Sequence, residues 1–155
     1  VLMFASHGLV AGEFHGLDEP ALVLTPPRAI SAADDSLLTS GEISRMSLSA
    51  DWVILSACNT AAPDGTPGAE GFSGLARAFF HAGALALLVS HWEVDSLATV
   101  ALTTKTVKAR SSAAGTSAAE ALSDAMREVR NDPKHPEWAH PAVWGAFSVV
   151  GELRR

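Results

Sequence analysis

Three apolar segments of this 155-residue sequence are each followed closely by a residue that can take part in chemistry. Apolar runs of this length are typical of buried strands. The carboxyl ends of parallel strands share one edge of a sheet, where ligands and catalytic groups gather. If the three strands are parallel, we expect the three reactive residues at that edge. The segments are 1–5 followed by His7, 52–57 followed by Cys58, and 84–90 followed by His91.

Cys58 and His7 have the chemistry of a nucleophile and its base. A thiol reacts as the thiolate and needs a neighbouring base or positive charge at neutral pH. His7, at the end of the adjacent expected strand, is the natural candidate for that base. A His about 50 residues before a strand-end Cys is also the chain order of caspase-type peptidases. Backbone N–H groups of Gly8 and Cys58 are candidates to hold a developing oxyanion.

Each residue of this pair also has a structural interpretation. A single Cys after a buried strand is more often an inert, small apolar side chain. A single His is more often a hydrogen-bonded structural residue. The joint placement of Cys58 and His7 at strand ends favours the catalytic interpretation, and spacing alone goes no further.

Periodicity places these residues on an α/β fold. A capping box of Thr39 and Glu42 predicts a short helix that begins within 38–43. Gly83 is expected to end a later helix, at 70–82. We expect 21–24 to form an edge hairpin strand, because two prolines follow it. The order of the elements predicts a mostly parallel sheet wrapped by helices. The expected strands are 1–5, 21–24, 52–57, 84–90 and 144–150, and the longer expected helices are 70–82, 95–109 and 117–130.

Composition narrows the class of protein. Hydrophobic residues make up 48% and charged residues 18%, which is typical of a globular domain. The net charge of −6, without a basic patch, argues against direct nucleic-acid binding. No apolar run is long enough to span a membrane, and no signal-like segment is present. One Cys excludes an internal disulfide, so we expect a reducing, cytoplasmic location. Abundant Ala and Gly with few Lys are compatible with a GC-rich bacterial source.

The start of the sequence predicts further structure before it. Residues 1–5 are apolar without alternation, which is typical of a strand buried on both faces. Such a strand normally has a neighbour on each side. We therefore expect βα units before Val1 to belong to the same domain.

Five segments together resemble the CHAT family, in the family's order and almost from end to end of the chain. The resemblance implies a caspase-like fold of peptidase clan CD, a three-layer α/β/α sandwich. It makes residues 1–6 the third strand, so that 1–155 is the C-terminal part of a single CHAT domain lacking its N-terminal strands. It also implies a cysteine endopeptidase that uses a His7/Cys58 dyad, a thioester acyl-enzyme and no cofactor or metal. The segments are FASHG at 4–8, VILSACNT at 53–60, EGFSGLARAF at 70–79, SHWEVD at 90–95 and HPAVWGAF at 140–147.

The sequence departs from the usual family pattern at four positions. The family commonly has Cys, Leu, Pro and Asp where this chain has Ser6, His91, Glu93 and Ser96. These differences spare the dyad and concern the substrate pocket.

We expect the substrate pocket to include Asp95, Trp92 and Ser56. Asp95 would pair with a basic side chain before the scissile bond; its alternative role is to cap the following helix. Trp92 would form a pocket wall or pack in the core.

Two other functions remain open from the sequence. The chain is alternatively a catalytically silent signalling or protein-interaction module on the same fold, since fold does not guarantee activity. A cysteine hydrolase of another class would use the same dyad on small esters. A protein or peptide is the expected substrate, and a TPR or other sensor region, in the same or a partner chain, is the expected regulator. No direct nucleic-acid or membrane partner is expected. His135 and His140 lack companions for a zinc site.

Overall fold

The structure is a computed structural model that describes residues 1–13, 15–29, 31, 35–56, 74–112 and 115–151. Its elements, in chain order, are β1 (Leu2–Phe4), β2 (Gly8–Leu9), β3 (Ala21–Val23), β4 (Leu37–Thr39), α1 (Ser40–Ser44), β5 (Trp52–Leu55), α2 (Gly74–His81), β6 (Ala86–Ser90), α3 (Ser96–Ser112), α4 (Ala118–Arg130), the 3₁₀ helix η1 (Pro136–Ala139), α5 (Pro141–Trp144) and β7 (Phe147–Gly151). None of the described helices is both long and apolar enough to cross a lipid bilayer.

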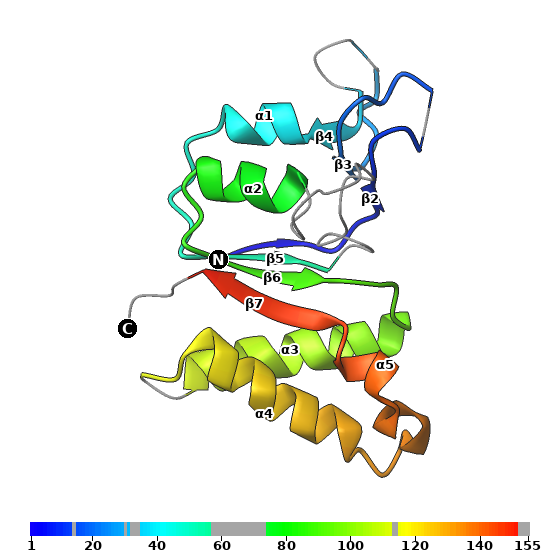
Figure 1. The fold of residues 1–155 in the computed structure, drawn as a ribbon, viewed down its shortest axis with the longest axis vertical. Helices are drawn as coiled ribbons and strands as arrows, with labels where there is room; N and C mark the ends of the chain where they lie inside the picture. Colours follow the sequence, from blue (N-terminus) through cyan, green and yellow to red (C-terminus); the bar gives the residue numbers. More distant parts are fainter. Residues whose placement is uncertain (14, 30, 32–34, 57–73, 113–114, 152–155) are drawn as a thin grey trace, which may run out of the picture.

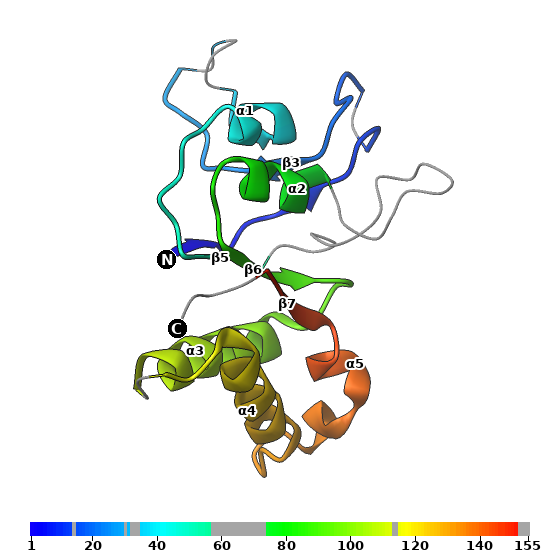
Figure 2. The same ribbon diagram turned by 60° about the vertical axis from the view of Figure 1, so that its left-hand side comes forward.

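A four-stranded sheet forms the centre of the molecule, in the order β1-β5-β6-β7. β1, β5 and β6 are parallel, and β7 runs antiparallel to β6. Helices α1 and α2 lie on one side of this sheet, and α3, α4 and α5 lie on the other (Figures 1 and 2). The expected three-layer α/β/α sandwich with a mostly parallel sheet is therefore confirmed.

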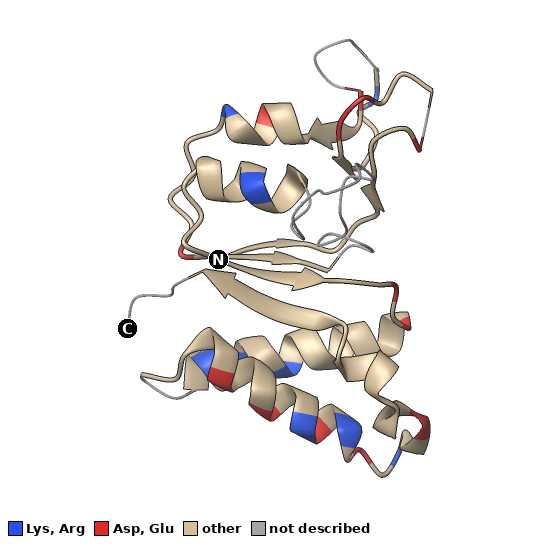
Figure 3. Cartoon of the chain, viewed as in Figure 1, with Lys and Arg blue, Asp and Glu red and all other residues tan. Residues whose placement is uncertain are grey.

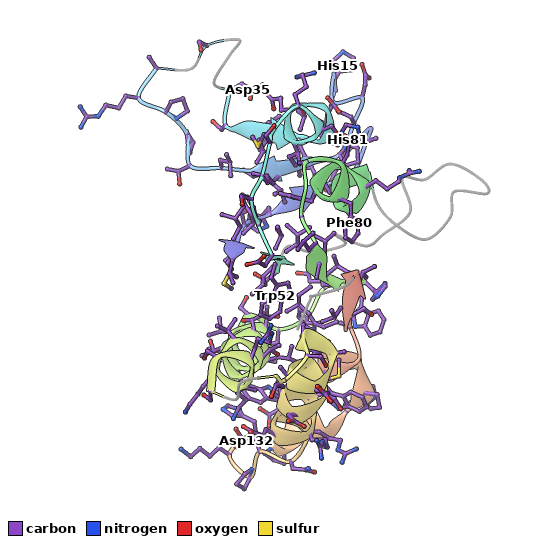
Figure 4. The ribbon with its side chains drawn as sticks, turned by 90° about the vertical axis from the view of Figure 1, so that its left-hand side faces the viewer. His15, Asp35, Trp52, Phe80, His81 and Asp132 are labelled. Atoms are coloured by element: carbon purple, nitrogen blue, oxygen red, sulfur yellow. The ribbon has the colours of Figure 1, made fainter. Side chains whose placement is uncertain are left out.

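Alternation along β5 and β6 produces two hydrophobic cores, one on each face of the sheet. Val53 and Leu55 pack with Leu87, Val89 and α2 residues on one face. Trp52 and Ile54 pack with Leu88 and residues of α3 and α4 on the other. Every residue of β5 and β6 is buried, as expected of strands covered on both faces. Figure 4 shows Trp52 at the sheet and His81 in the helical layer beyond it, where His81 Nδ1 lies 3.2 Å from the Ser44 carbonyl oxygen.

β1 differs from this pattern, and the expectation that it is buried on both faces is wrong for the described chain. The exposed fractions of Leu2 and Met3 are 37% and 51%. β1 pairs with β5 on one side, and no described strand lies on its other side. The apolar sequence of β1 therefore lies at an open edge.

A second, antiparallel sheet of three short strands stands beside the α1–α2 layer, in the order β2-β3-β4. The strand expected at 21–24 is present as β3, but it is the central strand and not an edge strand. Ala21 and Leu22 are fully buried there. Two prolines follow β3 and end the strand. β3 is nevertheless not at an edge, because β2 and β4 pair with it on its two sides.

Local signals placed several helix ends correctly. Thr39 and Glu42 form the expected capping box of α1, and Ser117 and Glu120 form one at α4. Gly83 follows α2 with φ +106°, and a Cβ there would lie 2.7 Å from the Leu48 carbonyl oxygen, so glycine is required.

The strand expected at 144–150 begins later than predicted, because 141–144 form α5. Pro141 occupies the first helical turn, where its missing N–H costs nothing. His140 Nδ1 accepts a hydrogen bond from Ala142 N at 3.2 Å and caps the turn. β7 then starts at Phe147.

Candidate active site

One edge of the central sheet gathers the carboxyl ends of β1, β5 and β6 and the amino end of β7 (Figure 1). His7, Ser56 and His91 directly follow or come within three residues of those strand ends. None of the described strands carries a charged residue, and the charges lie on helices and loops (Figure 3). Polar chemistry is thereby confined to the segments that leave the sheet.

His7 is exposed, at the point where the chain passes from the central sheet into β2. Its carbonyl oxygen accepts a hydrogen bond from Val23 N of β3 at 2.8 Å. The main chain of His7 is therefore fixed by the small sheet, while its imidazole remains accessible to solvent.

Gly8 follows with its N–H turned away from β3. Gly8 is paired opposite Leu22, and the neighbouring His7 carbonyl bonds to Val23 N. In an antiparallel ladder, hydrogen-bonded and non-bonded pairs alternate, so Gly8 and Leu22 form a non-bonded pair. The Gly8 N–H consequently points to the outer side of β2, next to His7.

Glu13 occupies one outward backbone donor next to β2. Val10 is the next residue whose N–H would face outward, and that N–H already donates to Glu13 Oε2 at 3.0 Å. Among the described residues, the outward N–H of Val10 is thus occupied by Glu13, while the N–H of Gly8 points to the same side of β2.

Ser56 joins the ends of β5 and β1. Its backbone N–H and its hydroxyl both donate to the Phe4 carbonyl oxygen, at 3.1 and 3.2 Å. Ser6, two residues after Phe4, has a buried hydroxyl oxygen that forms no hydrogen bond within the described part of the chain. Ser56 thus has a structural role at the site edge, which the sequence alone did not reveal.

Cys58 lies outside the described residues, as do the rest of 57–73 and the first turn expected at 70–73. The structure thus describes the base side of the predicted dyad, His7 and Gly8, and the strand that leads to Cys58.

His91 lies at the same edge as His7, but its ring is hydrogen-bonded on the β7 side of β6, away from β5. Its Nε2 is hydrogen-bonded to Ser148 Oγ of β7 at 2.8 Å, and its backbone N–H donates to the Ala146 carbonyl oxygen at 2.8 Å. β7 and β5 flank β6 on opposite sides. His91 therefore stabilises the β6–β7 junction rather than facing the end of β5.

Trp92 and Asp95 fix the loop between β6 and α3. The Trp92 indole N–H donates to the Ala142 carbonyl oxygen of α5 at 2.8 Å, while 42% of the residue stays exposed. Asp95 Oδ1 accepts hydrogen bonds from the backbone N–H groups of Leu97 and Ala98, at 3.1 and 3.0 Å. Of the two roles considered for Asp95, the capping role is present in the structure.

Glu19 is a contributor that sequence patterns gave no reason to single out. Its Oε2 accepts from Ser40 Oγ at 2.7 Å and from Gly41 N at 2.6 Å. The hydrogen bond from Ser40, followed by that from Gly41, holds the pKa of Glu19 below its usual value, against the opposing effect of burial. Glu19 thereby ties the loop between β2 and β3 to the start of α1.

A surface depression of the described chain lies away from the carboxyl ends of the strands. An open depression of about 700 Å³ lies between α3 and α4 among charged side chains, remote from the strand ends. It is crossed by the Lys105–Glu128 ion pair of 2.6 Å. Among the described residues no His, Cys, Asp and Glu cluster could hold a metal ion.

Comparison with known proteins agrees with this architecture. Tetratricopeptide repeat protein 28 of Mus musculus is 33% identical over 117 residues, which cover 74% of this chain and 4% of that protein. This chain therefore spans a small part of the length of that relative. The family model described as CHAT domain matches residues 1–152. The chain belongs to the CHAT domain family.

Proposed function

We propose that this chain is a cysteine endopeptidase module in which His7 and Cys58 form the catalytic dyad. The register of β1 and β5 carries the proposal. Leu2, Met3 and Phe4 pair with residues 51 positions later in the chain, and Cys58 is also 51 positions after His7. Both residues thus come three positions beyond the last pair of two adjacent parallel strands. Membership of the CHAT family supports the same pair.

His7 is suited to the role of base. Its main chain is held by β3, so the imidazole starts from a fixed position, and its exposure leaves room for a substrate. Gly8 supplies an outward N–H beside it, and the absence of a side chain lets a carbonyl oxygen approach that donor closely. The Cys58 N–H is the proposed second donor.

The reaction divides into two acyl transfers. Cys58 Sγ, deprotonated with His7 as proton acceptor, forms a bond to the carbonyl carbon of the scissile peptide. The tetrahedral oxyanion collapses, the C–N bond breaks, and His7 gives its proton to the leaving amine. Water, deprotonated by His7, then attacks the thioester, and the C–S bond breaks to release a carboxylate and the thiol. These steps use side chains and backbone N–H groups of the chain alone.

The substrate pocket is proposed to lie at the ends of β5 and β6. Trp92 offers a partly exposed ring that its bond to Ala142 holds in place. Asp95 uses Oδ1 to cap α3, so a basic substrate side chain would have to meet Oδ2. Ser56 contributes by fixing the end of β5 against β1.

We also propose that a TPR region governs the activity, and that the protein acts in the cytoplasm. The name of the similar mouse protein refers to tetratricopeptide repeats, and it is much longer than this chain. Repeat arrays form extended binding surfaces, which suits a sensor that would respond to a ligand or partner.

The test is cleavage of a randomised peptide library by the full-length protein, beside its Cys58→Ala and His7→Gln variants. Loss of cleavage in both variants is expected, because one removes the nucleophile and the other its base. Reaction of Cys58 with a peptidyl electrophile, followed by mass spectrometry, reads the thiol directly. The His7→Gln variant should lose about 100-fold or more in labelling rate.

His81→Gln is the matched control, since His81 is exposed and lies in α2, away from the strand ends. Cleavage that persists in Cys58→Ala would refute the proposal. Labelling of Cys58 without cleavage would indicate a primed site that awaits its activator. Absence of both would favour the silent interaction module.

A further inference from the structure

His7 and Gly8 are held by a different sheet from the one that leads to Cys58. Gly8 lies in β2, whereas Cys58 follows β5 of the central sheet, and no ladder joins the two sheets among the described residues. The chain passes from β1 to β2 through residues 5–7. One covalent crossing retains two soft backbone torsions per residue. Further contacts are therefore needed to orient the small sheet.

Apolar packing attaches the small sheet to the α1–α2 layer (Figure 1). Leu22 of β3 is fully buried and shares a core with Ile43 of α1 and Leu75 of α2. Burial of apolar surface is favourable but has no preferred direction. This packing holds β3 against the helices without setting its exact position along them.

Glu19 and Pro20, immediately before β3, supply the directional contacts. Glu19 Oε2 accepts hydrogen bonds from Ser40 Oγ at 2.7 Å and from Gly41 N at 2.6 Å. The Pro20 carbonyl oxygen accepts from Ser40 N at 2.9 Å. The buried Pro20 ring also lies against the start of α2, where a Cβ at Gly74 would come 3.2 Å from Pro20 Cγ. We call these contacts together the Glu19 clamp.

β3 connects the Glu19 clamp to the proposed base. The strand begins directly after the clamp, and the N–H of its last residue, Val23, donates to the His7 carbonyl oxygen at 2.8 Å. Gly8 pairs opposite Leu22 in the middle of the same strand. Strands joined by a hydrogen-bonded ladder move together. A shift of β3 would therefore displace His7 and the Gly8 N–H relative to the end of β5.

We propose that Glu19 is a positioning residue for the reaction, because its clamp sets the place of His7 and Gly8 relative to the end of β5. The inference rests on the proposed peptidase function. Proton transfer requires the base within hydrogen-bond distance of the thiol. A misplacement of about 1 Å can slow such a step by about 100-fold. The proposed pocket at the ends of β5 and β6 uses other residues, so Glu19 affects the rate of reaction and not the affinity for substrate.

The test measures labelling of Cys58 by a peptidyl electrophile in the full-length protein, over a range of electrophile concentrations. Glu19→Ala removes the acceptor for both hydrogen bonds, so the maximal labelling rate should fall at least about tenfold. The concentration that gives half of that rate should change by less than about twofold. Glu19→Gln keeps an oxygen acceptor at the same reach and should restore the maximal rate to within about threefold of wild type.

Glu120→Ala is the matched control. Glu120 Oε2 accepts from Ser117 Oγ at 2.7 Å and from Ser117 N at 2.8 Å, at the start of α4 on the other side of the central sheet (Figure 1). Its removal deletes the same kinds of hydrogen bond at a helix start, yet labelling should keep the wild-type rate. In hydrogen exchange, the amide of Val23 should exchange at least about tenfold faster in Glu19→Ala and at the wild-type rate in Glu120→Ala.

Ser40→Ala, which removes one of the two donors to Glu19, is the milder variant should Glu19→Ala fail to fold. Its maximal labelling rate should fall at least about threefold. An unchanged maximal rate in a folded clamp variant, or an equal fall in Glu120→Ala, would overturn the positioning role while leaving the dyad intact. Labelling that is the same in His7→Gln as in wild type would instead refute the dyad, and the role of Glu19 with it.

Discussion

Asp95 serves the fold through one oxygen, so its proposed effect on substrate preference has to be separated from its effect on stability. Its Oδ1 caps α3 through Leu97 N and Ala98 N. Asparagine is as good an N-cap as aspartate but carries no charge. The two roles can therefore be divided by comparing two substitutions at the same position.

We expect Asp95→Asn to keep the stability of the protein and Asp95→Ala to lower it by about 1 kcal/mol. If the carboxylate meets a basic substrate side chain, both variants should lose the preference for cleavage after Arg or Lys. Thermal unfolding and library cleavage measure the two effects. Unchanged preference in Asp95→Asn would show that Asp95 only caps the helix.

His7 and His91 show how two residues of one type differ at the same edge of the sheet, where they follow β1 and β6. His91 is occupied by Ser148 and by the backbone of Ala146, both near or in β7. His7 is exposed, and among the described residues its backbone carbonyl oxygen accepts from Val23 N. Residue type and spacing predicted that both lie at the edge, but not that Ser148 of β7 would engage the ring of His91.

At the scale of elements, α1 depends on contacts beyond its own five residues. A helix this short is unstable by itself. The Thr39 capping box stabilises its first turn, and Glu19 adds bonds from Ser40 and Gly41. Gly41 permits this approach, since a Cβ there would lie 2.9 Å from Glu19 Oε2.

Glu19→Gln should lower the free energy of unfolding by about 1 kcal/mol at neutral pH. The pKa of Glu19 is lowered in the folded state, so its charge stabilises the protein above the unfolded value of 4.5. That contribution is lost as the pH falls through the folded pKa. The difference between wild type and variant should therefore shrink below pH 4.5, as measured by urea unfolding. A difference that stayed constant with pH would contradict the charged hydrogen bonds.

The elements that the sequence predicted well are those whose signals lie within a few consecutive residues. The capping box of Thr39 and Glu42 lies within one turn, and β5 and β6 are apolar throughout. Contacts between distant segments were missed. β3 is central because β4 returns to it, and Glu19 reaches Ser40 across 21 positions. No local pattern contains such information.

At the scale of the whole molecule, one sheet separates two cores, and β6 belongs to both. Leu87 faces the α1–α2 side and Leu88 faces the α3–α4 side, and both are fully buried. Since adjacent residues of one strand support opposite layers, we expect the layers to unfold together.

Leu87→Ala and Leu88→Ala should each lower stability by about 2–5 kcal/mol. Trp52 and Trp138 belong to the core beside α3 and α4, so tryptophan fluorescence reports mainly that side, whereas circular dichroism reports helices on both. The two signals should show the same midpoint in each variant. Separate midpoints in Leu87→Ala would mean that the layers unfold independently.

The pairing of β7 with β6 also has a consequence for the order in which the protein is made. β6 leaves the ribosome before α3 and α4, and its antiparallel partner follows only after both helices and α5. Until then, the side of β6 that will receive β7 stays available to any other strand. His91 and Trp92 remain without Ser148, Ala146 and Ala142 during the same interval. A nascent chain consequently contains the proposed pair His7 and Cys58 early, whereas the residues that bond to His91 and Trp92 are synthesised last.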